Sequence, residues 1–311
     1  MKIAIVGLGW LGMPLAHRLS SKHQVVGSKR SLLDYQPPKE NSVGCYPLTL
    51  PISENEYEAL LNEKKRLPDP LLLSIQGLFQ ETDCLIITLP ASRNPAILEH
   101  YSASVKQLIT IAKNFKVKHT IFTSSTSVYG DSPGVYDEAS SCNPSSLPGK
   151  VLVELEQYLI ESLQDNITIL RLAGLAGANR HPGRFFQKPE AALQLEGTSL
   201  VNFVHGEDVI NAIDSIINDK LIHPFSPCNR KLMPIYNLCA PIHPSRNAFY
   251  QLTSELLGLP APIFKQSNYS CSNHPFKFDQ RVIDGLAITR DINFRYSHPN
   301  PLNFTYNDSL Y

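Results

Sequence analysis

Three closely spaced glycines near the start of the chain constrain its fold more than any other feature. Gly7, Gly9 and Gly12 follow the apolar run 3–6, which has the character of a buried strand, and precede residues 14–19, whose apolar positions can line one helix face. Glycines at these places permit a tight turn, close approach of a ligand and close helix packing, while the helix N-terminus supplies free N–H donors. The pattern predicts a turn that binds the pyrophosphate of a dinucleotide, and the alternative is a glycine-rich turn without a ligand. The cofactor contacts expected here are Gly7, Gly9, Trp10, Leu11 and Gly12.

The residues after the second predicted strand indicate which dinucleotide fits. In NAD-binding folds an acidic residue about 20 positions beyond the glycines holds the ribose hydroxyls. Here the strand 24–27 is followed by Ser28, Lys29 and Arg30, and a hydroxyl with two cations suits a ribose 2′-phosphate, which arginine can grip with two hydrogen bonds. The sequence therefore favours NADP over NAD, which stays possible as the cofactor. An exposed basic turn is the alternative interpretation.

Strand-like and helix-like segments alternate over the first half of the chain. The strand-like segments are nearly continuous apolar runs, as expected for parallel strands that are covered on both faces, and the helix-like segments carry apolar stripes of helical period. This alternation predicts an α/β fold with a doubly wound parallel (Rossmann) sheet. Pro90 ends one strand at the edge where a cofactor would bind, so it joins the expected cofactor contacts. We expect strands at residues 45–50, 84–90, 119–123 and 167–172, and helices at residues 100–115 and 151–163.

The pattern changes after about residue 175. Shorter helix-like and strand-like segments are then separated by proline-rich loops. We expect residues 1–175 to form the dinucleotide-binding domain and residues 176–311 to form a smaller C-terminal substrate-binding lobe over the carboxyl ends of the strands. The expectation allows some segments of this lobe to add strands to the Rossmann sheet. The expected helices are 207–218 and 245–257, and the expected strands are 201–203 and 235–238.

Composition narrows the class of partner. The 28 basic and 28 acidic side chains balance, and no basic stripe indicates nucleic-acid binding. No apolar run is long enough to cross a membrane. The six cysteines lack the spacing of a zinc site or a disulfide framework, which favours reduced thiols in a cytoplasmic protein without a metal. The expected partner is a small-molecule substrate.

A hydroxyl-rich segment, 123–130, lies where a central strand ends beside the expected nicotinamide position. Its sequence, Thr-Ser-Ser-Thr-Ser-Val-Tyr-Gly, resembles the Ser-Ser-x-x-Val-Tyr-Gly segment of extended short-chain dehydrogenase/reductases, the NAD(P)-dependent epimerase/dehydratase superfamily. Further matches follow in the family's order at 170–180, 201–209 and 236–238. The resemblance implies hydride exchange with a substrate such as a sugar nucleotide, and it allows a homodimer through the helices that flank the serine strand.

The catalytic residues of that family are only partly present. The resemblance assigns the serine that holds the substrate oxygen to Ser125. The tyrosine and lysine of the family's Tyr-Gly-x-x-Lys-x-x-x-Glu pattern fall on Pro148 and Leu152 when Gly149 and Glu156 are matched. Neither side chain can transfer a proton. The chain therefore resembles an atypical branch of the family that has lost or relocated this pair.

Three residues are candidates to replace the missing tyrosine. Tyr129 lies close to the serines, Lys150 lies in the displaced motif, and His205 lies in a segment that faces the cleft in relatives. Histidine titrates in the useful range. We take Ser125 and Tyr129 as the catalytic candidates. Packing or substrate lining is the alternative role for Tyr129, and a structural role is the alternative for His205.

A basic loop in the expected substrate lobe supplies candidate substrate contacts. Arg180 and Arg184 lie close together in the sequence, beside His181 and Gly183. Guanidinium groups suit a carboxylate or phosphate of a substrate, whereas a solvated surface loop is the alternative. We therefore count Arg180, Arg184 and His205 as expected substrate contacts.

Three functions follow from these residues. The first is an NADP-favouring oxidoreductase or epimerase/dehydratase in which a substrate carbon near Ser125 exchanges hydride with the cofactor. The second is a dinucleotide-binding sensor or regulatory protein without turnover, because the Tyr-Lys pair is missing. The third is a β-hydroxyacid-type dehydrogenase, since residues 5–16 also resemble the first turn of those enzymes. That class carries a long all-helical second domain, which the proline-rich second half of this chain does not predict.

Overall fold

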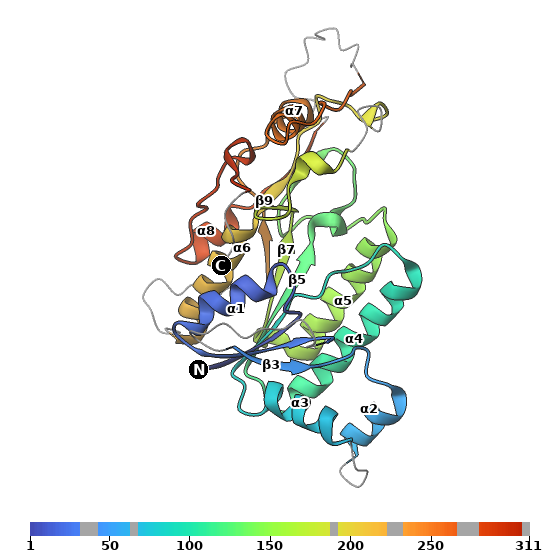
Figure 1. The fold of residues 1–311 in the computed structure, drawn as a ribbon, viewed down its shortest axis with the longest axis vertical. Coiled ribbons are helices and arrows are strands. Elements are labelled where there is room, and N and C mark those ends of the chain that lie inside the picture. The colour runs from blue at the N-terminus through green and yellow to red at the C-terminus, as the bar shows by residue number, and fades with distance from the viewer. Residues whose placement is uncertain (32–42, 63–67, 187–191, 223–232, 266–279, 307–311) are drawn as a thin grey trace.

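The computed structural model describes residues 1–31, 43–62, 68–186, 192–222, 233–265 and 280–306. At its centre is a seven-stranded sheet with the strand order β10-β7-β5-β4-β1-β2-β3 (Figure 1). All neighbouring strands run parallel. The predicted α/β Rossmann fold is confirmed. The strands are β1 (Lys2–Val6), β2 (Gln24–Lys29), β3 (Gly44–Pro47), β4 (Cys84–Ile87), β5 (His119–Ser125), β7 (Ile167–Leu172) and β10 (Ile235–Leu238).

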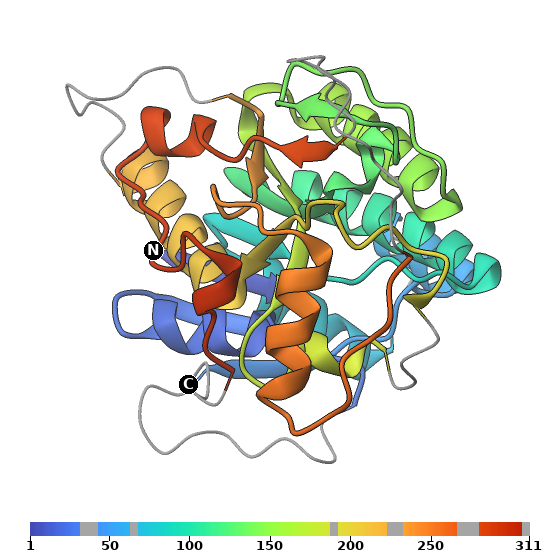
Figure 2. The same cartoon turned by 90° about the horizontal axis from the view of Figure 1, so that it is seen from above.

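Helices cover both faces of this sheet. Figures 1 and 2 show α1 beside α6 on one side and α4 beside α5 on the other. The sheet is therefore buried on both faces, and β1, β4 and β7 are apolar or buried along nearly their whole length. The helices are α1 (Gly12–Ser20), α2 (Glu54–Leu61), α3 (Asp69–Phe79), α4 (Pro95–Asn114), α5 (Leu147–Leu163), α6 (Gly206–Ile216), α7 (Arg246–Glu255) and α8 (Ala287–Asp291).

Strand order reverses beside β1. The chain runs from β1 to β2 and β3 on one side and then crosses to β4 on the other side. Ligands of open parallel sheets bind at such a reversal, outside the carboxyl ends of the strands. The glycine turn directly follows β1, so it lies at this point.

The chain after β7 forms smaller structures above the carboxyl ends of the strands and returns one strand to the main sheet. Strand β8 (Gly174–Ala176) pairs with β9 (Phe203–His205), and β6 (Gly134–Tyr136) pairs with β11 (Arg281–Ile283). A separate apolar cluster that includes Phe203, Phe249 and Tyr250 lies among these elements. Strand β10 joins the edge of the main sheet beside β7.

Helix α5 begins earlier than the apolar stripe at 151–163 predicts, at Leu147. The Ser146 side chain accepts a hydrogen bond from the backbone N–H of Gly149, and Pro148 lies in the first helical turn, where a proline is well tolerated. Pro148 and Gly149 therefore belong to the helix and not to the preceding loop. Strand β9, in contrast, begins later than the predicted strand 201–203, at Phe203.

No helix in the described ranges combines the length and apolar character needed to cross a membrane. Cys45, Cys84, Cys142 and Cys239 carry free thiols. Cys228 and Cys271 lie outside the described residues.

Candidate functional site

A cleft of about 1020 Å³ opens at the carboxyl ends of the central strands. Its lining comes from the turn after β1, from residues 88–91 after β4, from the serines at the end of β5 and from residues 172–175 at the end of β7. Four neighbouring strands thus contribute to one cavity because parallel strands end at the same edge. Gly7, Gly9, Trp10, Leu11 and Pro90 are among the lining residues.

The glycine turn has the geometry that each glycine predicts. Gly7 adopts a φ of 107°, which a side chain would strain. A Cβ on Gly12 would lie 2.1 Å from the carbonyl oxygen of Gly7, so only glycine lets α1 start this close to the turn. A Cβ on Gly9 would meet nothing within 4 Å, because Gly9 faces open space.

Two backbone donors of this turn are unused. Within the described residues, the N–H groups of Trp10 and Leu11 contact no hydrogen-bond acceptor. They lie at the N-terminus of α1, where the helix contributes partial positive charge. Free N–H donors and open space at Gly9 suit the oxygens of a pyrophosphate, so the residues present fit a dinucleotide at this place.

The residues expected to select NADP lie at the end of β2. Ser28 is paired with Val6 in the register of β2 and β1 and is only 4% exposed. Lys29 is half-buried and Arg30 is exposed. None of the three lines the cleft itself. They lie one strand away from the glycine turn, on the side toward β2 and β3.

Two serines at the end of β5 line the other end of the cleft, but their hydroxyls differ in their hydrogen bonding. Ser124 is buried and donates to the Oε1 atom of Glu156 at 2.5 Å. Ser125 is half-buried, and its Oγ accepts a hydrogen bond from the backbone N–H of Ser127 at 3.1 Å. The proton of the Ser125 hydroxyl is therefore available to a ligand oxygen, whereas that of Ser124 is used by Glu156.

A buried polar network lies behind these serines. Glu156 forms an ion pair with Arg171, and Arg171 donates to the hydroxyl of Tyr129, which in turn donates to Asn237. Burial lowers the pKa of Arg171, but the hydrogen bonds to Glu156 and the charge of Glu156 outweigh this effect, so the pKa is raised. Burial raises the pKa of Tyr129, although Arg171 partly opposes this. Tyr129 is 1% exposed and does not line the cleft, so its hydroxyl serves this network.

The two positions at which the sequence analysis expected a displaced tyrosine and lysine also lie at the cleft. Pro148 and Leu152, one turn apart on α5, both line it. Lys150 is exposed and does not. At this wall, therefore, the described cleft presents two apolar side chains.

Sequence reasoning missed four charged or aromatic side chains that line the cleft. Asp131 accepts a hydrogen bond from Ser145, and Arg281 donates to the carbonyl oxygens of Gly130 and Thr126. Arg93 and Tyr101 come from the segment after β4. Arg281 lies 151 residues from Gly130 along the chain, so only the fold brings Arg281 and the neighbouring Asp131 to one cleft.

Tyr101 is unusual among the lining residues. It is 6% exposed, and no described atom forms a hydrogen bond with its hydroxyl. Burial raises its pKa, and the charge of Glu156 raises it further. The phenol is therefore neutral and unpaired in the wall of the cleft.

The three expected substrate contacts are separated in the structure. Arg180 lines the cleft, whereas Arg184 is exposed outside it. His205 is 3% exposed and does not line it. Its Nε2 bonds with the carbonyl oxygen of Thr305, and its Nδ1 accepts from the N–H of Glu207 at the start of α6.

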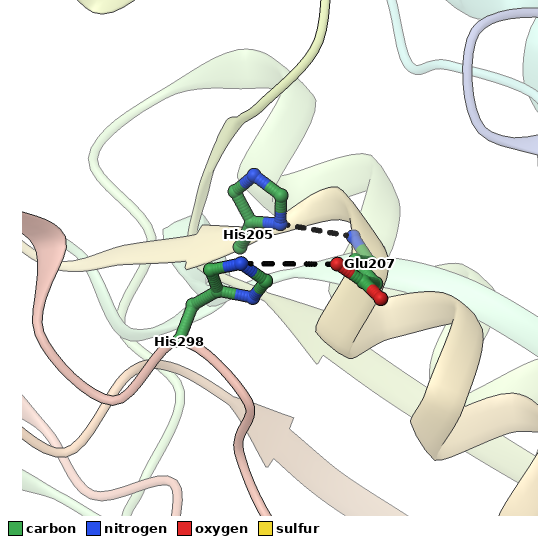
Figure 3. A group of neighbouring side chains, drawn as sticks. All are labelled: His205, Glu207 and His298. Atoms are coloured by element: carbon green, nitrogen blue, oxygen red, sulfur yellow. Dashed lines mark hydrogen bonds and ion pairs between the residues drawn. The ribbon is translucent and has the colours of Figure 1, made fainter. Parts of the chain in front are cut away.

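His205, Glu207 and His298 form a cluster whose possible ligand atoms all lie within 4.8 Å (Figure 3). The two imidazole rings stack at a centroid distance of 3.9 Å and an angle of 29°. Ring lone pairs lie in the ring planes, so stacked rings do not direct them at one point. Both nitrogens of His205 are also engaged. His205 caps the N-terminus of α6 and packs against His298. The cluster is therefore unsuited to hold a metal.

Comparisons with known proteins agree with this arrangement. The model of the NAD dependent epimerase/dehydratase family matches residues 90–224. Protein YeeZ of Escherichia coli strain K12 is 40% identical over 302 residues, which are 97% of each chain.

Solved structures share the fold at low sequence identity. UDP-glucose 4-epimerase of Thermus thermophilus, in complex with NAD, has a TM-score of 0.69 and 16% identity, covering 100% of this chain and 98% of that one. UDP-glucuronic acid 4-epimerase of Bacillus cereus, in complex with NAD, has a TM-score of 0.67 and 19% identity, with the same coverage.

Proposed function

The chain belongs to the NAD-dependent epimerase/dehydratase family, and we propose that it is an enzyme that binds NADP in preference to NAD and exchanges hydride with a small-molecule substrate. The bound nicotinamide would supply the hydride chemistry. The cleft supports this proposal most directly, because one cavity joins the glycine turn to the Ser125 hydroxyl. A dinucleotide anchored at the turn can extend from there across β4 toward β5.

The NADP preference rests on the end of β2. Arg30 is exposed, and Lys29 precedes it, one strand away from the glycine turn on the side where the adenosine ribose of a dinucleotide lies in such folds. No carboxylate precedes them in β2 that would bind ribose hydroxyls. A ribose 2′-phosphate at this place would receive charge-assisted hydrogen bonds from Arg30.

Ser125 is proposed to hold the reacting oxygen of the substrate. Its hydroxyl lines the cleft, and no acceptor among the described residues takes its proton. The usual Tyr-Lys pair is proposed to be absent, with Pro148 and Leu152 in its place. Asp131 is the carboxylate among the described lining residues, and we propose it as the group that exchanges the proton.

The substrate is proposed to be of sugar-nucleotide type. Two structural relatives are epimerases of UDP-sugars by their names. In this chain, Arg281 places a half-buried cation at the cleft. Burial lowers the pKa of Arg281, although the charge of Asp131 opposes this shift. An anionic substrate would stabilise that cation further.

Calorimetric titration with NADPH, NADH and their oxidised forms tests the cofactor, and incubation with UDP-sugars followed by product analysis tests turnover. Product analysis is needed because an epimerase that recycles its hydride consumes no net NADPH. We expect Ser125→Ala and Asp131→Asn to lower turnover at least about 100-fold with dinucleotide affinity unchanged. Absence of binding by either dinucleotide at millimolar concentration would overturn the proposal.

A sensor or regulatory protein without turnover is the second candidate. One observation favours it: the described cleft lining contains no histidine, lysine or cysteine, and its tyrosine is held neutral. Tight dinucleotide binding without any product from the sugar-nucleotide panel would support this candidate. The long all-helical domain of a β-hydroxyacid-type dehydrogenase is not present in the described residues after Leu172.

A further inference from the structure

The glycine turn is tied to a second turn that lies far away in sequence. The indole Nε1 of Trp10 donates a 2.6 Å hydrogen bond to the carbonyl oxygen of Ala178. Ala178 belongs to residues 177–180, which form a tight turn closed by two backbone hydrogen bonds between Gly177 and Arg180. This 177–180 turn follows β8, so a segment from the second half of the chain lies directly against the proposed pyrophosphate site.

Arg180 extends from the 177–180 turn over the face of Trp10. The centre of its guanidinium lies 5.5 Å from the ring centroid, and its Nε donates to the carbonyl oxygen of Leu175. These two contacts hold the guanidinium in place. Its terminal nitrogens, Nη1 and Nη2, have no acceptor in the part of the chain that the structure describes.

The charge of Arg180 also lacks a local counterion. No carboxylate in the described ranges forms an ion pair with it, and partial burial lowers its pKa. It lines the same cleft as Gly7, Gly9 and Trp10. A positioned cation with two unused terminal NH2 groups therefore lines the same cleft as Trp10 and Leu11, whose backbone N–H groups are also unused. Such a set is complementary to the oxygens of a diphosphate.

The 177–180 turn packs against the buried side chain of His205. Gly177 adopts a φ of 145°, and a Cβ there would lie 3.1 Å from the Nε2 of His205. His205 is itself stacked on His298 (Figure 3), and its Nε2 is hydrogen-bonded to the carbonyl oxygen of Thr305. The buried histidine therefore packs closely against the backbone of the turn at Gly177.

We propose that Arg180 binds the pyrophosphate of the dinucleotide, so that the cofactor is held by the glycine turn and by the 177–180 turn together. This role rests on the proposed function and assigns Arg180 to the cofactor instead of to the substrate. Arg281, Ser125 and Asp131 remain the proposed substrate contacts.

Trp10 makes the proposal directly measurable. It is the only tryptophan of the chain, and it touches both turns, so its emission reports ligands that arrive at this place. Titrations with NADPH, ADP and AMP, followed by Trp10 emission and by calorimetry, compare ligands with and without a diphosphate. The variants are Arg180→Met, Arg180→Lys and, as a matched control, the exposed Arg184→Met.

We expect Arg180→Met to weaken NADPH and ADP binding at least about tenfold, with a smaller effect on AMP and a shallower dependence on salt. Arg180→Lys should recover part of the loss, and Arg184→Met should bind as the wild type does. Circular dichroism and thermal unfolding verify that Arg180→Met is folded.

Two outcomes distinguish failure of the role proposed for Arg180 from failure of the proposed function. If the wild type binds dinucleotides and folded Arg180→Met binds NADPH and ADP equally well, Arg180 has no role at the pyrophosphate, while the proposed function stands. If the wild type binds no dinucleotide by calorimetry, the proposed function fails and the role of Arg180 fails with it.

Discussion

Arg171 donates hydrogen bonds to both carboxylate oxygens of Glu156, and the shortest of these N–O distances is 2.6 Å. Both side chains are at most 5% exposed. The pair joins β7 to α5, and it connects Ser124 in the cleft wall with Tyr129 behind it. The hydroxyl orientation of Ser124 therefore depends on a buried ion pair.

Removal of one charge from this pair should destabilise the protein strongly. Glu156→Leu leaves the Arg171 cation buried without a partner, and we expect the free energy of unfolding to fall by about 3–5 kcal/mol. The double variant Glu156→Leu, Arg171→Met replaces both charges with apolar groups and should regain most of that loss. Urea unfolding measures both. A single variant as stable as the wild type would show that the pair is not buried in solution.

Reversal of the charge at the end of β2 should change the cofactor preference. In Arg30→Asp, the carboxylate repels a 2′-phosphate and accepts hydrogen bonds from ribose hydroxyls. We expect affinity for NADPH to fall about 10–100-fold and affinity for NADH to be equal or higher. Calorimetry with both dinucleotides measures the ratio, and Arg184→Asp controls for net charge. An unchanged NADPH affinity would remove Arg30 from the cofactor site.

Alanine at two glycines of one turn should affect different properties, the stability at Gly12 and the dinucleotide affinity at Gly9. Gly12→Ala places a methyl group 2.1 Å from the Gly7 carbonyl oxygen, so α1 must shift and thermal stability should drop. Gly9→Ala meets no protein atom within 4 Å, so the melting temperature should stay close to that of the wild type while dinucleotide affinity falls. If Gly9→Ala bound dinucleotides normally, no ligand would approach the turn at this residue.

The hydroxyl of Tyr101 should be dispensable for stability. It is buried without a partner among the described residues, so Tyr101→Phe removes an unsatisfied polar group, and the free energy of unfolding should stay the same or rise by up to about 1 kcal/mol. Tyr129→Phe is the contrast, because it leaves Arg171 and Asn237 without the hydroxyl between them and should cost about 1–3 kcal/mol. Equal losses in the two variants would contradict this difference.

Acid should destabilise the protein partly through His205. Burial lowers the pKa of His205 below its ordinary value of 6.5, and the neighbouring His298 also lowers it, while the hydrogen bond to Thr305 and the charges of Asp208 and Glu207 oppose the shift. The unfolded chain therefore binds a proton at a higher pH than the folded one. The stabilisation is complete above about pH 6.5 and is lost as the pH falls toward the lowered pKa.

His205→Asn tests this dependence. Asparagine retains an acceptor for the N–H of Glu207 in the first turn of α6 but does not titrate. We expect the variant to lose less stability than the wild type between about pH 7 and pH 5, measured by urea unfolding at each pH. Parallel curves for the two proteins would assign the acid sensitivity to other groups.

The sequence by itself determined the parallel Rossmann sheet, since its strands are apolar runs that alternate with helical stripes, and it determined the glycine turn, whose spacing is a local backbone requirement. Local signals likewise placed Ser125 at a strand end and Pro148 and Leu152 in the displaced motif. Only the tertiary structure decided that Arg281 and Asp131 share the cleft, that Tyr129 and His205 are buried behind it, and that Arg180 lies over Trp10. These relations join residues that are distant along the chain, and packing between distant segments leaves no period or spacing in the sequence.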